Sequence, residues 1–276
     1  MKAGAARLGA LLFARDRLPL RWSLAVLSAL ALVVDARGPW SDWASAALGL
    51  QGAALRRWSR RAWWGRDASH AVRLRLDDPR RRHQAEALIE APDWTRLDRL
   101  RGSRGVLLAA AHVGPSQAAA DSVVRHCADA LFLFWNAHPG IAGEQRLLAA
   151  PGPRRWAFVE ASGRLRDGGV VFWAADDPDV RPLQVAMFGW PVRLSRAAAT
   201  LARLSAAATI PIAATWEAGR IRVVLGEALE PASDDPEEWE RRWLSGYCRF
   251  LEGVVAADAA NLRLDVGLWA ALARPD

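Results

Sequence analysis

The chain has 276 residues, 52% of them hydrophobic, and a formal net charge of +7. Such a chain can bury one large core, which excludes a small scaffold that depends on disulfide staples. Its two cysteines, Cys127 and Cys248, are too few for a disulfide framework and favour a reducing compartment, and no Cys/His group has the spacing of a metal site.

The basic residues are almost all arginine, since Lys2 is the only lysine, and 15 Trp stand against one Tyr. A positive surface suits nucleic acid, anionic lipid or an acidic carrier protein. Trp settles at headgroup depth and Arg pairs with phosphate, so the combination favours an anionic membrane surface as partner. Because no nucleic-acid-binding motif accompanies the charge, we expect no nucleic-acid partner.

Residues 17–34 read RLPLRWSLAVLSALALVV, and the uncharged part, 22–34, would form a helix of about 20 Å. A span needs about 20 residues, so this stretch is a membrane-dipping or marginally transmembrane anchor. A buried helix is the alternative. A cleaved signal peptide is a further one, although residues 35–37 make a poor cleavage site.

Residues 55–66 read LRRWSRRAWWGR, and at helical spacing Leu55, Trp58 and Ala62 share a face between arginines. This pattern is typical of a helix lying in an anionic interface, with an ordinary solvated basic helix as the alternative. We therefore expect residues 1–65 to form a membrane-associated helical segment and residues 66–276 to form a separate domain.

Further along, 80–91 and 93–101 have helical patterns, and then short apolar strands begin to alternate with helices. Strands are expected at 106–111, 130–135 and 168–176, helices at 114–127, 140–149, 160–167 and after Ser195, an antiparallel strand pair at 209–217 and 220–227, and a long helix at 236–256. This alternation predicts an α/β fold with a mostly parallel central sheet flanked by helices.

His112 ends the first of these strands, in LLAAAHVGPSQ. Ligands of open α/β sheets bind beyond the carboxyl ends of the strands, beside helix N-termini. Gly114 allows close backbone approach, Pro115 suits a first helical turn, and the N–H groups of that turn can hold an oxyanion. A neutral imidazole there can take a proton from a hydroxyl. A histidine that merely bonds the backbone at a helix entry is the alternative.

A series of features in the same order resembles the lipid A biosynthesis lauroyl/myristoyl acyltransferase family of the glycerolipid acyltransferase superfamily. These features are an N-terminal apolar helix, the strand VLLAAA ending in His112, the stretch DGGVVFWAADDPDVRPLQVAMFGWPVRLS at 167–195, and the small-residue helix and strand pair that follow. The resemblance runs from about residue 18 to about residue 270 and is strongest from 104 to 231.

The resemblance implies an acyltransferase with His112 as general base. It would move a fatty acyl chain from an acyl carrier protein or coenzyme A thioester to a hydroxyl of a lipid or glycolipid. It implies no metal and no cofactor beyond the donor thioester, and a place at the cytoplasmic face of the bacterial inner membrane.

The sequence departs from the family at two points. The acid of the family's His-x4-acid motif falls at Gln117, which can hold a tautomer but cannot stabilise an imidazolium by charge, and an expected arginine is absent beside Asn136. Asp176 and Asp177 leave a strand at the same sheet edge as His112 if the strands are parallel, and so can replace the acid; a capped turn at Pro178 is the alternative. Asp121 and Glu144 are weaker candidates.

The remaining candidates bind substrate. Arg181 can meet a phosphate of the donor or acceptor, or pair with Asp177 or Asp179. Phe188 and Gly189 form a tight turn that suits a substrate wall, though a turn needs no function. Because Gln117 stands at the acid position, a lipid-binding relative that has lost its chemistry and acts as a partner protein is the alternative to an active enzyme.

Overall fold

The structure is a computed structural model that describes residues 17–33, 39–134, 147–149, 154–176 and 182–263. The helices are α2 (Leu20–Val33), α3 (Pro39–Leu48), α4 (Gly52–Leu76), α5 (Arg82–Glu86), α6 (Thr95–Leu100), α7 (Ser116–His126), α8 (Arg154–Arg166), α9 (Ala197–Ser205), α10 (Pro236–Ala257) and the 3₁₀ turn η2 (Ala259–Asn261). The strands are β1 (Ile89–Glu90), β2 (Val106–Ala110), β3 (Leu131–Phe134), β4 (Leu147–Ala149), β5 (Val170–Ala174), β6 (Leu183–Met187), β7 (Trp190–Leu194), β8 (Ala208–Glu217) and β9 (Arg220–Leu225).

A seven-stranded sheet in the order β1-β9-β8-β2-β5-β3-β4 forms the centre of the molecule. Its neighbouring strands are parallel except β8 and β9, which form an antiparallel hairpin around a two-residue turn. The prediction of a mostly parallel central sheet flanked by helices is therefore confirmed. The apolar runs VLLAA and VVFWA become the two central strands, as expected for strands that are covered on both faces.

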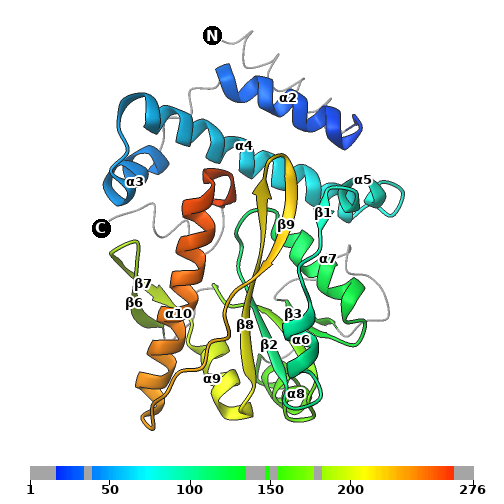
Figure 1. Ribbon diagram of the computed structural model, residues 1–276, viewed down its shortest axis with the longest axis vertical. Coiled ribbons are helices and arrows are strands. Elements are labelled where there is room, and N and C mark those ends of the chain that lie inside the picture. The colour runs from blue at the N-terminus through cyan, green and yellow to red at the C-terminus, as the bar shows by residue number, and fades with distance from the viewer. Residues whose placement is uncertain (1–16, 34–38, 135–146, 150–153, 177–181, 264–276) are drawn as a thin grey trace.

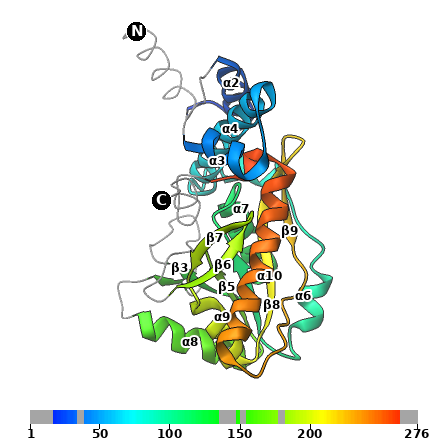
Figure 2. The same cartoon turned by 90° about the vertical axis from the view of Figure 1, so that its left-hand side faces the viewer.

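Alternate residues of each strand point into two cores on opposite faces of the sheet. Leu107, Ala109 and Trp173 pack with α8, α9, α10 and the β6–β7 hairpin. Val106, Leu108 and Phe172 pack with α4 and α7 on the other face. Figures 1 and 2 show these layers, with α4 crossing one end of the sheet and α2 lying on the outer side of α4.

The N-terminal helices pack against the rest of the protein in a way that the sequence pattern does not predict. Trp58 packs against Trp43 at 5.9 Å and Ala62 is buried, so the face expected to lie in a membrane interface points into the protein. The expected domain boundary after residue 65 falls in the middle of helix α4. Among the described helices, none is both long enough and apolar enough to traverse a bilayer.

Three strand regions differ from the sequence-based expectations. Residues 89–90 pair with β9 instead of extending a helix, and residues 147–149 form β4 instead of ending a helix over 140–149. The β6–β7 hairpin was not predicted, although its buried residues alternate with exposed ones from Leu183 to Met187. For β1 and β4, pairing with a strand far along the chain overrides a weak local preference.

A buried carboxylate joins α9 to α10. Glu240 has no exposed surface and accepts hydrogen bonds from Arg196, Arg203 and the hydroxyl of Thr200, the last at 2.8 Å. An arginine at the N-cap of α9 and an arginine within α9 thus converge on a single acid of α10. A carboxylate removed from water in this way is tolerated only because its oxygens are fully bonded.

We expect Glu240→Ala to lower the free energy of unfolding by about 3 kcal/mol, at the low end for a broken buried pair, since both arginines are partly exposed and can turn to water. Chemical denaturation measures this. Glu160→Ala, on the exposed face of α8, is the control and should change stability by less than about 0.5 kcal/mol. Equal effects of the two substitutions would contradict a structural role for Glu240.

Candidate active site

The register of the two central strands places His112 opposite Asp176. Strands β2 and β5 are parallel with Ala110 opposite Ala174, and the amide of Ala175 continues the ladder by donating to the carbonyl of Ala110 at 2.8 Å. Two residues beyond this pair, both strands have ended and their following segments leave the sheet. His112 and Asp176 therefore emerge side by side at the carboxyl edge, where parallel sheets bind ligands.

Asp176 holds both the backbone and the ring of His112. Its Oδ2 accepts the backbone N–H of His112 at 2.7 Å, and its Oδ1 lies 2.9 Å from Nδ1 of the imidazole. The carboxylate side chain is 0% exposed, whereas the side chain of His112 is 36% exposed. The pair thus combines a buried, fixed acid with a ring that reaches solvent.

This geometry selects one form of the histidine. When the Asp176 carboxylate accepts a hydrogen bond from Nδ1–H, a neutral ring carries its lone pair on Nε2, the nitrogen that can act as base. If Nε2 then takes a proton, the carboxylate stabilises the imidazolium. A buried acid, an oriented histidine and an exposed edge of the ring are the elements of general acid–base catalysis.

The loop after His112 is held by the C-terminal turn. Gly114 has φ +49°, and its amide donates to the carbonyl of Asn261 at 2.7 Å. A Cβ at this position would lie 2.3 Å from the carbonyl oxygen of Ala214, so only glycine fits. The backbone amide of Gly114 is thus already bonded within the protein, and its predicted contact with substrate stays a prediction. Helix α7 begins at Ser116, four residues after His112, and no side chain in the described part of the chain caps it.

Sequence reasoning missed the residues that support this loop from the C-terminal part of the chain. Asn261 is fully buried; its Oδ1 accepts from the amide of Trp216 at 2.7 Å and its Nδ2 donates to Val254 O at 3.1 Å. The hydroxyl of Tyr247 donates to the carbonyl of Ala110 at 2.5 Å, at the end of β2. Being the only tyrosine in the chain is the one feature that could have drawn attention to it.

The other candidate residues lie apart from the ring of His112 or outside the described residues. Gln117 is half-buried in the first turn of α7, and the carboxylate at Nδ1 of His112 comes from Asp176 instead of position 117. Asp121 pairs with Arg125 at 2.9 Å and with Arg82 at 3.5 Å, and its burial raises the pKa of its carboxyl group. Four candidate residues lie outside the described residues, namely Asn136, Glu144, Asp177 and Arg181.

Phe188 and Gly189 form the turn of the β6–β7 hairpin, with φ +51° and +75°. The amide of Phe188 donates to Glu252 on α10, and its ring meets Trp43 edge to face at 5.3 Å. The turn is thus bound between α3 and α10. These contacts account for the tight turn without a substrate.

The described residues offer few other reactive groups. Both cysteines are buried; burial raises the pKa of Cys127, and it raises the pKa of Cys248 to about 12, so neither thiol is an activated nucleophile. No group of three or more His, Cys, Asp or Glu side chains that could hold a metal ion occurs within the described ranges.

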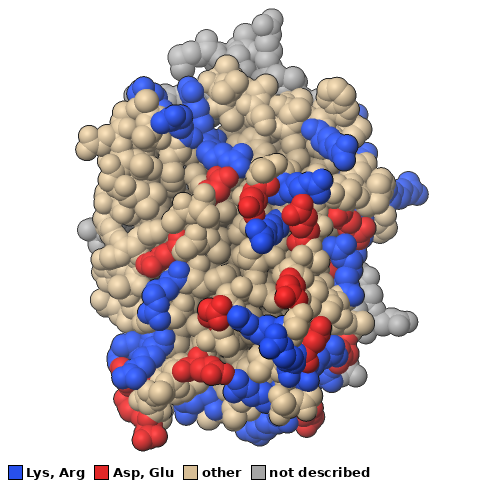
Figure 3. Space-filling model, viewed as in Figure 1, with Lys and Arg blue, Asp and Glu red and all other residues tan. Residues whose placement is uncertain are grey.

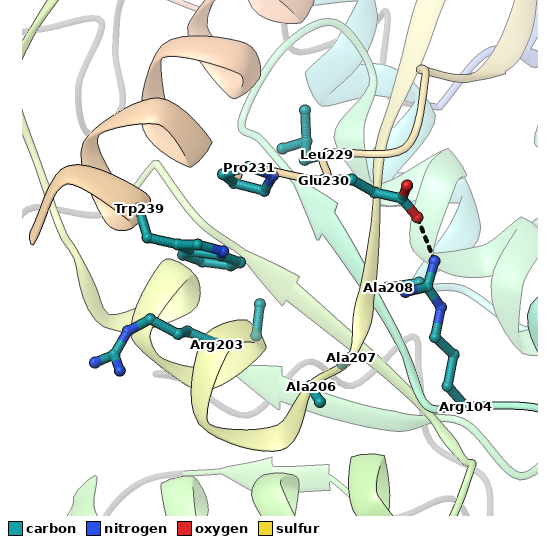
Figure 4. A pocket seen from close by; sticks show the side chains of 10 residues that line it. Arg104, Arg203, Ala206, Ala207, Ala208, Leu229, Glu230, Pro231 and Trp239 are labelled. Carbon is teal, nitrogen blue, oxygen red and sulfur yellow. Dashed lines mark hydrogen bonds and ion pairs between the residues drawn. The ribbon is translucent and has the colours of Figure 1, made fainter. Parts of the chain in front are cut away.

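A pocket of about 300 Å³ lies at the opposite edge of the sheet, where β8 begins (Figure 4). The indole of Trp239 lies on one side, and on the other Arg104 is bonded to Glu230. A further lining residue, Arg203, is paired with Glu240, which also binds Arg196. The charged side chains that line the pocket are thus paired within the protein, and the pocket lies at the far end of β2 and β8 from His112.

Comparison with protein-family models finds none that matches this chain, and comparison with curated proteins finds no significant match.

We expect Gly114→Ala to destabilise the protein by about 2 kcal/mol or more, because it combines a left-handed backbone with a clash against a carbonyl. Gly253→Ala is the matched control: Gly253 lies within α10 with open space around it, so alanine should stabilise by about 0.5–1 kcal/mol. Denaturant unfolding measures both values. A Gly114→Ala protein as stable as the wild type would contradict the described loop.

Proposed function

We propose that this protein is a membrane-associated acyltransferase that moves a fatty acyl chain from a thioester to a hydroxyl of a lipid or glycolipid. The pairing of Nδ1 of His112 with the buried carboxylate of Asp176 is the observation that carries the proposal. It supplies an oriented general base at the carboxyl edge of an α/β sheet, the position that the family resemblance implies for the catalytic histidine.

In this reaction Nε2 of His112 removes the proton of the acceptor hydroxyl as its oxygen attacks the thioester carbon. The tetrahedral intermediate then collapses, the carbon–sulfur bond breaks, and the imidazolium returns its proton to the thiolate. An ester and a free thiol result, with no redox change and no covalent enzyme intermediate. Asp176 stabilises the imidazolium through Nδ1–H, a role that Gln117 could not perform.

The intermediate carries a negative charge that needs donors. Gly114 is not one of them, because its amide is bonded to Asn261. The uncapped first turn of α7 supports the proposal instead, since its amides and helix dipole favour negative charge beside His112. The donor would be a thioester of acyl carrier protein, whose acidity suits the net charge of +7, or of coenzyme A.

A lipid-binding relative without chemistry remains the alternative function. Its main support was Gln117 at the position where the family carries an acid. The carboxylate of Asp176 on the histidine ring removes that reason, because the charge lost at position 117 is present on the neighbouring strand. The geometry therefore favours an active enzyme, which we place at the cytoplasmic face of a bacterial inner membrane.

The dyad is tested by substituting each partner. His112→Ala should abolish acyl transfer. Asp176→Asn should lower kcat about 10⁴-fold, as amide replacement does in a serine-protease triad, because the amide group stabilises the tautomer with its proton on Nε2. The KM for the donor should change little. An assay with acyl carrier protein and coenzyme A thioesters against several lipid hydroxyl acceptors measures this, and full activity of His112→Ala would contradict the proposal.

Gln117→Glu separates the two possible positions for the acid. Since Asp176 already occupies Nδ1 of His112, we expect a new carboxylate at position 117 to change kcat by less than about ten-fold, or to lower it through repulsion between like charges. A rise of several orders of magnitude would show instead that the wild type lacks an acid. The pH profile of kcat, measured for Asp176→Asn and Gln117→Glu, distinguishes a changed protonation of the imidazole from a misfolded site.

A further inference from the structure

Helix α2 has one buried and one exposed apolar face. Leu20, Leu27 and Leu30 are buried in the molecule, where α2 packs along α4. On the outward face Trp22, Leu32 and Val33 are 63%, 68% and 77% exposed. Arg21 is the only charged residue of α2, and the exposed Ser28 hydroxyl is satisfied within the helix by the carbonyl of Leu24. The outward face is therefore almost entirely apolar.

Exposed large apolar side chains are concentrated here. Seven are found among the described residues, and four of them lie between residues 18 and 33, the others being Trp156, Val159 and Leu204. Scattered exposed apolar residues are normal, whereas a contiguous group on one helix face marks an interaction site.

A cluster of arginines without ion pairs lies beside this face. Arg56, Arg57 and Arg60 on the first turns of α4 pair with no acid in the described part of the chain, whereas the next residue, Arg61, is bound to Asp258 at 2.6 Å. The described residues from 17 to 66 contain one acid, Asp42. In Figure 3 the surface over α2 is mostly uncharged, and blue side chains without red neighbours gather over the start of α4.

Many arginines elsewhere on the described surface are paired with acids. Arg101 and Arg164 share Asp129, and Arg241 and Arg242 pair with Glu238 one turn away. The described residues from 17 to 66 hold seven arginines against a single acid, so positive charge is in excess where the apolar face is exposed. An apolar face that holds a tryptophan and adjoins unpaired arginines matches an anionic bilayer, because Trp enters the headgroup region while guanidinium groups bind phosphate.

We infer that the outward face of α2, together with Arg56, Arg57 and Arg60 of α4, docks on an anionic lipid bilayer, with α2 lying in the plane of the interface. The 14 residues of α2 span about 21 Å, less than the roughly 30 Å of a hydrocarbon core, and the helix is bound along its length to α4. This inference rests on the proposed function for its biological purpose, but the surface does not depend on the chemistry at His112.

Flotation of the full chain with vesicles tests the surface, using phosphatidylcholine alone and phosphatidylcholine mixed with phosphatidylglycerol. The wild type should bind the mixed vesicles and bind neutral ones weakly. Replacing Arg56, Arg57 and Arg60 together by Gln should weaken binding to mixed vesicles about a hundred-fold, since each arginine near an anionic surface contributes about five-fold. Replacing Trp22, Leu32 and Val33 by Ser should weaken binding to both kinds of vesicle.

The controls use matched residues elsewhere on the surface. Trp156→Ser with Val159→Ser removes exposed apolar groups from α8, and Gln at Arg80, Arg99 and Arg249 removes three exposed arginines outside the proposed surface. Both control proteins should float like the wild type. Thermal unfolding checks that every variant folds, which we expect because most of the substituted side chains are exposed.

The outcomes separate this inference from the proposed function. His112→Ala should float like the wild type, because the docking surface does not include it. Flotation that depends on α2 and α4, without acyl transfer to any acceptor, would support the docking surface and contradict the proposed chemistry. Acyl transfer to soluble acceptors without vesicle binding, or equal losses in the control proteins, would overturn the docking surface and leave the chemistry intact.

Discussion

At the centre of the sheet, β2 runs parallel to β5 with Ala110 opposite Ala174, and this register places Asp176 against His112. A shift of one residue would point the carboxylate to the opposite face of the sheet. The register is fixed by buried side chains on both faces, and the carbonyl of Ala110 is held from two sides, by the amide of Ala175 and the hydroxyl of Tyr247. The candidate site therefore inherits its geometry from the packing of the core.

The sequence was sufficient for elements whose signal is local. Strong apolar runs predicted β2, β5 and β8, and Asp235 with Pro236 and two glutamates is a helix start that can be read directly. Two of the elements that it missed depend on distant partners. Strand β1 has two residues and forms by pairing with β9, and β4 forms beside β3. The β6–β7 hairpin was concealed because Phe188-Gly189 was interpreted as a turn without its flanking strands.

The candidate site was likewise predictable in its local features but not in its contacts between distant segments. A histidine at a strand end and acids at a second strand end are both visible in the sequence, and parallel strands place them at one edge. The acid that binds the imidazole of His112 is determined by the pairing of β2 with β5, and no local sequence pattern predicts that these two strands are neighbours. The use of the Gly114 amide was hidden for the same reason, because its acceptor, Asn261, lies 147 residues further along the chain and carries no motif.

Two glycines show how closely the N-terminal helices are joined to the histidine loop. A Cβ on Gly65 of α4 would lie 2.1 Å from the carbonyl oxygen of Ala260. The carbonyl of the next residue, Asn261, accepts a hydrogen bond from the amide of Gly114. Arg61 binds Asp258 at the start of the same turn. Such close backbone contacts leave no room for the helix to slide past the turn. A surface on α2 and α4 that rests on a bilayer would therefore fix the height and orientation of His112 relative to the bilayer, because backbone contacts at η2 join that surface to the loop that follows His112.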